Sequence, residues 1–202
     1  MKASGLRFVI AALAAALSSP VLPQAQQGER VRGTIEKLDG DVLAVKSSDG
    51  QAMRIKLTED ARIVGVAKAS LADIKPGSFI GSAAMPQPDG SQKALEVHIF
   101  PEALRGTGEG HRPYSIPNST MTNGTVGKAV TSVEGHTVSV AYKGGEKKIV
   151  VPSGVPIVRY EIGDRSDLKP GAAFTVLSAV KKPDGTYETN RVNVGRNGAV
   201  PQ

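Results

Sequence analysis

The chain contains no cysteine and no tryptophan, and phenylalanine and tyrosine together make up only 4% of its 202 residues. The absence of cysteine excludes disulfide bonds, thiolate metal ligands and a cysteine nucleophile. The small number of aromatic rings argues against single-stranded nucleic-acid binding, because that class of protein needs stacking platforms for the bases. We therefore expect no nucleic-acid partner and a fold that is held together by packing alone.

The sequence also lacks an apolar run of the roughly 20 residues that are needed to cross a bilayer. Its longest apolar run covers residues 8–17, lies after Lys2 and Arg7, and is followed by small and helix-breaking residues. This order is typical of a secretory signal peptide. We predict a signal peptide over residues 1–25 and a soluble, exported protein in the bacterial periplasm.

The whole chain has a formal net charge of +6 at pH 7, and the positive charge is concentrated in its second half. Residues 31–100 hold nine basic and nine acidic side chains, whereas residues 124–196 hold eleven basic and seven acidic ones. Exposed charge runs usually serve solubility. We interpret the lysines of this half as a solvated face with at most weak affinity for anionic glycans or lipid head groups: Lys143, Lys147, Lys148, Lys181 and Lys182.

Two segments share one pattern at a spacing of 95 residues. Residues 31–50 read VRGTIEKLDGDVLAVKSSDG, and residues 126–145 read VGKAVTSVEGHTVSVAYKGG. A Lys-Pro-Gly turn and a Pro-Asp-Gly turn recur later in both segments at a spacing of 94 or 95. A repeat of this kind indicates one structural unit that was copied. We predict a domain over residues 29–101, a structured linker over 102–122, a second domain over 123–197 and a tail over 198–202.

Each repeat is predicted to be built from strands. Its apolar residues recur with a period close to two and are largely β-branched. Glycine-containing turns punctuate them, and Ser70 and Asp73 have the spacing of a capping box for one helical turn before the fourth strand. Three strands, a short helix and two strands are the order of an OB-type barrel. We predict an all-β protein of two tandem five-stranded OB-like barrels; open meanders or sandwich halves are the alternative.

Several stretches resemble a known group of proteins. They are LADIKPGSFIG (71–81), MPQPDGSQKALEVHIFPE (85–102), RGTGEGHRP (105–113) and GGEKKIVVP (144–152). The chain is similar to exported bacterial proteins built from tandem OB-like domains of unknown function. Some members of that group carry the name metal ABC transporter permease, but a permease needs several membrane-spanning helices. The resemblance therefore implies export and a fold, and it implies no activity.

The segment RGTGEGHRPY, residues 105–114, is rich in glycine and superficially similar to a dinucleotide-binding loop. A phosphate site of that type needs a strand before the loop and a helix start after it. Here Pro113 and Pro117 follow instead, and Glu109 would place a negative charge inside the loop. We interpret the segment as a structured hinge that joins the two barrels and sets the angle between them.

A groove between the barrels is the expected place for a ligand, because ligand sites favour the junctions of domains. Long or amphipathic side chains of the hinge can lie across such an interface. The candidate ligand-binding residues are Arg105, His111, Arg112 and Tyr114.

A metal site is the second hypothesis. Glu96 and His98 alternate with apolar residues and should share one face of their strand. If the hinge folds back, it could add ligands for a borderline metal such as zinc or copper. The candidate metal ligands are Glu96, His98, Glu102 and His111. The second repeat has Arg191 and Asn193 where the first has Glu96 and His98, so an outward polar face is the alternative interpretation.

An enzyme is not expected, because the sequence holds no Gly-x-Ser-x-Gly elbow and only three histidines. We expect a non-enzymatic periplasmic binding or scaffold protein without a cofactor, whose partner is a small ligand or another periplasmic protein. A soluble periplasmic metal-binding accessory protein is the alternative.

Overall fold

The computed structural model describes residues 28–132 and 135–201. The predicted signal peptide, residues 1–25, lies outside the described residues. The expected all-β class is confirmed: the described residues form twelve strands and three 3-10 helices. Each helix has three residues, so none of the helices in the described segments could span a membrane.

The elements follow one another along the chain in an order that mixes long and short strands. They are β1 (Glu29–Asp39), β2 (Val42–Ser47), β3 (Ala52–Lys68), η1 (Leu71–Asp73), β4 (Phe79–Pro86), β5 (Gln92–Ile99), η2 (Glu102–Leu104), β6 (Gly110–Pro113), β7 (Thr120–Ser132), β8 (Gly135–Tyr142), β9 (Gly145–Pro152), β10 (Ile157–Ile162), η3 (Arg165–Asp167), β11 (Ala173–Lys181) and β12 (Tyr187–Gly195).

Five strands close into a barrel, which we call barrel A. They are hydrogen-bonded in the order β12-β11-β1-β2-β3, and β12 pairs in parallel with β3 to complete the ring. Apolar side chains of these strands point inward and form one cluster. Ile35, Leu43, Ile55 and Phe174 are among the fully buried residues of its core.

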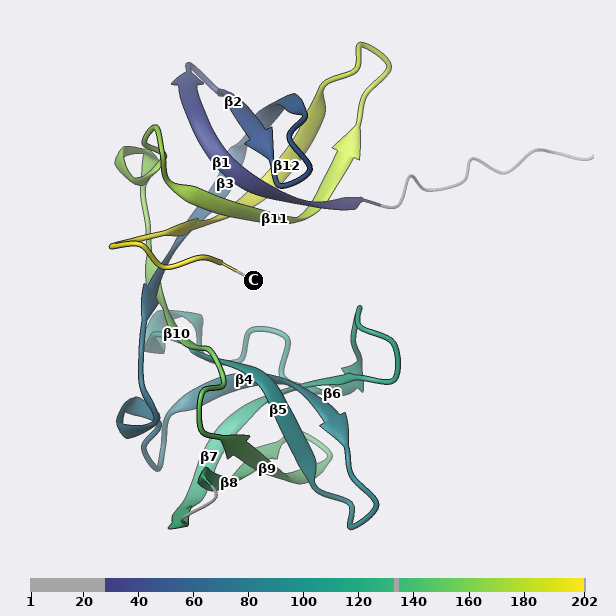
Figure 1. Ribbon diagram of the computed structural model, residues 1–202, viewed down its shortest axis with the longest axis vertical. Coiled ribbons are helices and arrows are strands. Elements are labelled where there is room, and N and C mark those ends of the chain that lie inside the picture. The colour runs from purple at the N-terminus through teal and green to yellow at the C-terminus, as the bar shows by residue number, and fades with distance from the viewer. Residues whose placement is uncertain (1–27, 133–134, 202) are drawn as a thin grey trace, which may run out of the picture.

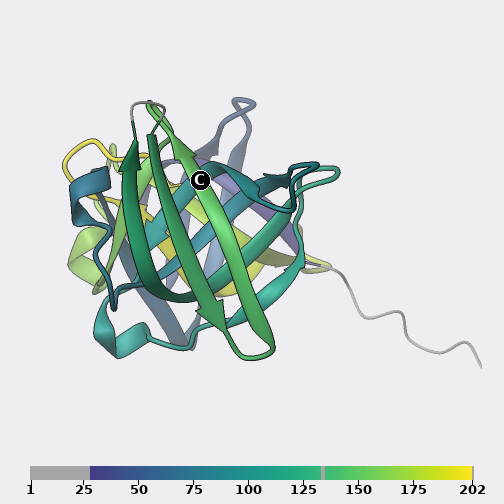
Figure 2. The same cartoon turned by 90° about the horizontal axis from the view of Figure 1, so that it is seen from below.

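A second set of strands, which we call barrel B, closes in the same way. Its order is β5-β4-β7-β8-β9, and β5 pairs in parallel with β9. Its core is a separate cluster that includes Ile80, Val97, Val138 and Ile149. Figure 2 views the molecule from the side of barrel B, whose teal and green strands lie in front of the purple strands of barrel A.

The pairing differs from the expected one, in which each repeat closes on itself. Barrel A takes β1–β3 from residues 29–101 but β11 and β12 from residues 123–197, and barrel B takes the reciprocal halves. The short helices follow the same exchange: Ile74, after η1, is part of core B, whereas Leu168, after η3, is part of core A.

The exchange of strands coincides with an unusually long β3. This strand continues for 17 residues. It contains no proline, and its only glycine, Gly65, does not have the positive φ that would turn the chain back. It therefore runs past barrel A and reaches barrel B, antiparallel to β10. Figure 1 shows β3 and β10 passing between the two barrels on one side of the molecule.

The segment predicted to join the barrels connects two strands of one barrel instead. Residues 102–122 run from β5 to β7, and both strands belong to barrel B. Within this segment β6 pairs with β7, which holds residues 110–113 against barrel B. The barrels are linked by β3, which extends beyond barrel A, and by β10, which pairs with β3 on one side and with β5 of barrel B on the other.

Candidate functional site

A layer of aromatic rings lies between the two barrel cores. Phe79 and Phe100 are 5.3 Å apart, Phe100 and Tyr160 are 5.3 Å apart, and His98 stacks on Tyr160 at 5.0 Å with an interplanar angle of 12°. None of these residues belongs to either core cluster. The chain has only four phenylalanines and four tyrosines. It therefore places three of its eight large rings at one junction, where they fix the surroundings of His98.

A pocket of ≈150 Å³ opens beside this layer, and we call it the inter-barrel pocket. Barrel A contributes residues of β1, β11 and β12, barrel B contributes residues of β5 and β7, and the remainder come from β10 and the segment after β5. The lining residues are Arg30, Glu96, His98, Phe100, Thr107, Gly108, Arg112, Tyr114, Met121, Asn123, Tyr160, Leu177 and Arg191.

The shared face expected for Glu96 and His98 is observed. Both side chains line the pocket, and Glu96 Oε1 lies 4.0 Å from His98 Nδ1. Burial lowers the pKa of His98 from 6.5 to about 4, and the positive charges of Arg191 and Arg112 act in the same direction. His98 is therefore a neutral imidazole at pH 7.

Glu96 is held in a more mixed environment. Burial raises the pKa of its carboxyl, against the lowering effects of the charge on Arg30 and of a hydrogen bond from Tyr114. Arg30 Nη2 in turn donates to Tyr114 Oη at 2.9 Å. Since Arg30 belongs to barrel A and Glu96 to barrel B, this chain of contacts ties the two walls of the pocket together.

Asn123 carries a buried side-chain oxygen whose hydrogen-bonding capacity is unmet among the described residues. Its Nδ2 donates to the carbonyl of Thr107 at 2.9 Å. Its Oδ1 is buried and has no hydrogen-bond partner among the described residues. The residue is 4% exposed, so bulk solvent does not satisfy the oxygen. Buried acceptors in folded proteins are normally bonded, which makes this oxygen the strongest local indication of a ligand.

Gly81 of β4 explains how two large polar groups fit here. It pairs with His98 on one side and with Asn123 on the other. A Cβ at this position would lie 2.3 Å from His98 Nε2 and 2.6 Å from Asn123 Oδ1. The missing side chain therefore provides the space in which the imidazole and the amide meet.

Two of the four predicted ligand-binding residues line the pocket, namely Arg112 and Tyr114. Arg105 does not: it forms a salt bridge with Glu102 at 2.6 Å and donates to the carbonyl of Gly77. His111 does not either, because its Nδ1 is 2.8 Å from Thr122 Oγ1 and its ring stacks on Tyr142. Arg105 lies over the Phe79 ring, and His111 lies against β7 and β8 of barrel B.

The predicted metal set is not brought together. Glu96 and His98 are neighbours, but Glu102 is occupied by Arg105 and His111 lies against Thr122. The described residues contain no group of three or more histidine, aspartate or glutamate side chains that could hold a metal ion. The hinge, which was expected to carry the two missing ligands to the strand, is instead held by the pairing of β6 with β7.

Sequence reasoning did not select Arg30, Asn123, Tyr160 and Arg191 for this site. A signal existed for Arg191, because it corresponds to Glu96 at the spacing of the repeat. Both positions lie on the last strand of a repeat and both line the pocket. Nothing in the sequence indicated that Arg30 or Asn123 would line the pocket, because the exchange of strands between the barrels brings them to it.

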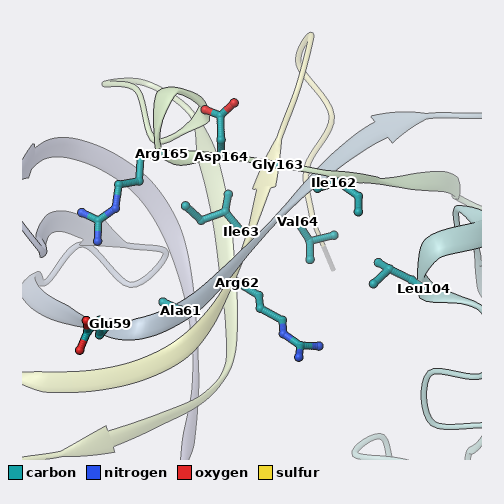
Figure 3. A pocket seen from close by; sticks show the side chains of 10 residues that line it. All are labelled: Glu59, Ala61, Arg62, Ile63, Val64, Leu104, Ile162, Gly163, Asp164 and Arg165. Carbon is teal, nitrogen blue, oxygen red and sulfur yellow. The ribbon is translucent and has the colours of Figure 1, made fainter.

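Larger hollows exist on the surface, and one of ≈340 Å³ is drawn in Figure 3. Leu104 approaches from the segment after β5 and points toward Val64 of β3 (Figure 3). Two charged residues of this hollow are engaged elsewhere, because Arg165 pairs with Asp41 and Asp164 caps η3. We place the candidate site in the smaller inter-barrel pocket because His98 and Asn123 are buried there and the Asn123 oxygen has no partner among the described residues.

Comparison with known proteins adds no name to this arrangement: no family, curated protein or solved structure matches the chain. The geometry itself offers hydrogen-bond donors from several guanidinium groups, one amide acceptor and a flat aromatic wall. Such a pocket can orient a small polar molecule.

Proposed function

We propose that the protein is an exported, non-enzymatic binding protein that holds a small ligand between its two barrels in the periplasm. The proposal depends on one observation: Asn123 Oδ1 is a buried acceptor at the pocket and has no hydrogen-bond partner among the described residues. Leaving such a group unpaired costs about 1–3 kcal/mol. A ligand that donates to this oxygen would recover that free energy on binding.

The strand order supports an OB-like assignment for both barrels. Numbering the strands of barrel A along the chain, the order around the ring is one, two, three, five, four, with strands three and five parallel. Barrel B has the same order when its strands are numbered by their position in a repeat, with β7, β8 and β9 as strands one to three and β4 and β5 as strands four and five. We propose that the pair arose by duplication of one OB-like unit followed by exchange of its last two strands.

A binding role is favoured over catalysis by the state of His98. A general base works best when its pKa lies near the operating pH. Burial lowers the pKa of His98 to about 4, and its ring is fixed against Tyr160 and Phe100. The imidazole is thus placed as part of a wall rather than as a proton carrier.

Native mass spectrometry of the protein recovered from the periplasm of its own bacterium tests the proposal. We expect a population that retains a small-molecule mass, at least tenfold reduced in Asn123→Ala and unchanged in Asn190→Ala, an exposed asparagine of β12. Bare protein in every preparation would count against a binding role. A retained zinc or copper mass would favour the metal-binding accessory protein instead. The same spectra report whether residues 1–25 have been removed.

A further inference from the structure

Three arginines from different elements converge on the inter-barrel pocket: Arg30 from β1, Arg112 from β6 and Arg191 from β12. Among the described residues none of them forms an ion pair within 4.0 Å, whereas the chain pairs four other arginines with acids. Their hydrogen bonds go to neutral acceptors, namely Tyr114 Oη, the Gly108 carbonyl and Asn193 Oδ1.

The acid in the pocket does not balance this charge. Glu96 is the only carboxylate among the lining residues, so the lining carries two more positive than negative charges even with Glu96 ionised and His98 neutral. Guanidinium groups gathered without acidic partners are the usual recognition elements for carboxylates and phosphates. The pocket therefore favours an anion over a neutral or cationic ligand.

The shape and the remaining polar group narrow the ligand class. A volume of ≈150 Å³ is below the range of about 300–1,000 Å³ that is usual for drug-sized ligands, so the occupant is small. Asn123 Oδ1 is an acceptor and would repel a bare carboxylate. The ligand must therefore bring an O–H or N–H donor to Asn123 as well as an oxyanion to the arginines.

We propose that the inter-barrel pocket binds a small oxyanion that also carries a hydroxyl donor. Arg112 and Arg191 hold the anionic oxygens, and Asn123 accepts from the hydroxyl. A hydroxydicarboxylate and hydrogen phosphate share this chemistry. This inference rests on the proposed function, because it names the ligand class for the same pocket.

Isothermal titration with four probes separates the sources and the alternatives. Tartrate and inorganic phosphate satisfy both requirements, succinate lacks the hydroxyl, and erythritol lacks the charge. We expect tartrate or phosphate to bind with at least tenfold higher affinity than succinate, and erythritol to release no heat. Binding by only one of the first two identifies the carboxylate or the phosphate as the source.

Two arginine variants test the pocket itself. Arg112→Gln removes a charge at the exposed rim, where its guanidinium bonds only the Gly108 carbonyl, so the fold is not at risk. We expect at least tenfold weaker binding of the preferred anion in Arg112→Gln and in Arg191→Gln. The matched control is Arg54→Gln, an exposed arginine of β3 that should change affinity by less than twofold.

The outcomes also distinguish this inference from the proposed function. Unchanged anion affinity in both pocket variants, or erythritol binding as tightly as tartrate, overturns the oxyanion assignment. A neutral molecule retained in the native mass spectra would do the same while leaving the binding role intact. If no probe binds and only bare protein is recovered, both proposals fall.

Discussion

The last strands of the two repeats, β5 and β12, contribute to one pocket with different chemistry. β5 brings Glu96 and His98 to the pocket, and β12 brings Arg191, which bonds Asn193 behind it. Arg191 and Asn193 stand 95 positions after Glu96 and His98. β5 belongs to barrel B and β12 to barrel A, so the two strands lie on either side of the junction. One wall carries a carboxylate and an imidazole, and the other carries a guanidinium. The pocket is therefore a property of the pair of barrels and is not present in a single repeat.

The largest effect is expected from a test of the exchange itself. Thr34 of β1 lies opposite Ala173 of β11, and opposed residues in an antiparallel pair have Cα atoms about 4.5–5.5 Å apart, within disulfide reach. Because the chain has no cysteine, Thr34→Cys/Ala173→Cys should form a single intramolecular disulfide on oxidation. Ser78 is the nearest counterpart of Ala173 in the first repeat, so Thr34→Cys/Ser78→Cys should stay reduced.

Mass spectrometry of tryptic peptides under non-reducing conditions reads out both pairs. Cross-linking of the second pair alone would mean that each repeat closes its own barrel. A cross-linked dimer from the first pair would place the exchange between two copies of the chain. Either outcome would break the comparison of β5 with β12 as walls of one pocket.

The local structure could be predicted from the sequence to a large degree. Strand alternation, the turns at Gly40, Gly50 and Gly90 with their positive φ, and the helical turn after Ser70 all follow from short-range chemistry. The exchange could not be predicted, because both pairings use the same strands with the same apolar faces. The two segments differ in one respect: β3 is a single continuous strand, whereas the corresponding part of the second segment is divided into β9 and β10.

The site was predicted in part for the same reason. Glu96 and His98 share a face because alternation within one strand is local. Arg112 and Tyr114 reach the pocket because β6 lies along β7. Arg30 could not be inferred, since its place beside Tyr114 depends on a contact between residues 84 positions apart in the chain.

The next effect in size concerns His98 and pH. The pKa of its imidazole is about 4 in the folded protein and 6.5 when unperturbed. Between these pH values the unfolded chain binds a proton that the folded protein does not, so stability falls as the pH drops from 6.5 to 4. The full loss is about 3 kcal/mol, and it is absent above pH 6.5. Asn193 stands at the position that corresponds to His98 in the second segment. The substitution His98→Asn should therefore remove this dependence of stability on pH.

Chemical denaturation from pH 4 to pH 7.5 measures the slope in both proteins. Glu96 acts in the opposite direction, because burial raises its pKa and favours its protonated form in the folded state. The difference between the two proteins therefore isolates the imidazole, and equal slopes would show that His98 is not buried as a neutral ring.

A smaller effect is expected at Gly81, against which the side chains of His98 and Asn123 pack. Gly81 lies beside His98 in barrel B, and Thr175 lies beside Asn193 in barrel A. Gly81→Ala should lower the free energy of unfolding by about 1–3 kcal/mol, because the new methyl group overlaps His98 and Asn123. Gly127→Ala is the matched control in β7, where a Cβ meets its nearest atom at an ordinary 3.4 Å.

Urea denaturation of both glycine variants gives the comparison. Gly127→Ala should be neutral or slightly stabilising, since alanine loses less backbone entropy than glycine on folding. If Gly81→Ala were as stable as its control, the imidazole and the amide would not be packed over the glycine as described. Barrel B would then tolerate a side chain here as barrel A tolerates Thr175.

The smallest effect compares the capping-box aspartates of η1 and η3. Asp167 of η3 accepts from Arg196 Nε at 2.9 Å and Nη2 at 2.7 Å, and its side chain is 15% exposed. Asp73 of η1 bonds Arg159 through one nitrogen and is 34% exposed. Asp167→Asn should therefore lower the free energy of unfolding by about 1–2 kcal/mol at pH 7, and Asp73→Asn by less.

The pH dependence shows whether charge is the cause. Hydrogen bonds from Arg196 hold the pKa of Asp167 below its usual value of 3.8. The stability that this ion pair contributes is thus present above that value and is lost as the pH falls through the lowered pKa. Thermal unfolding at pH 7 should separate Asp167→Asn from the parent, and the gap should shrink toward pH 2. A gap that stays constant would indicate lost packing or capping geometry, and the two helices would then differ in shape rather than in electrostatics.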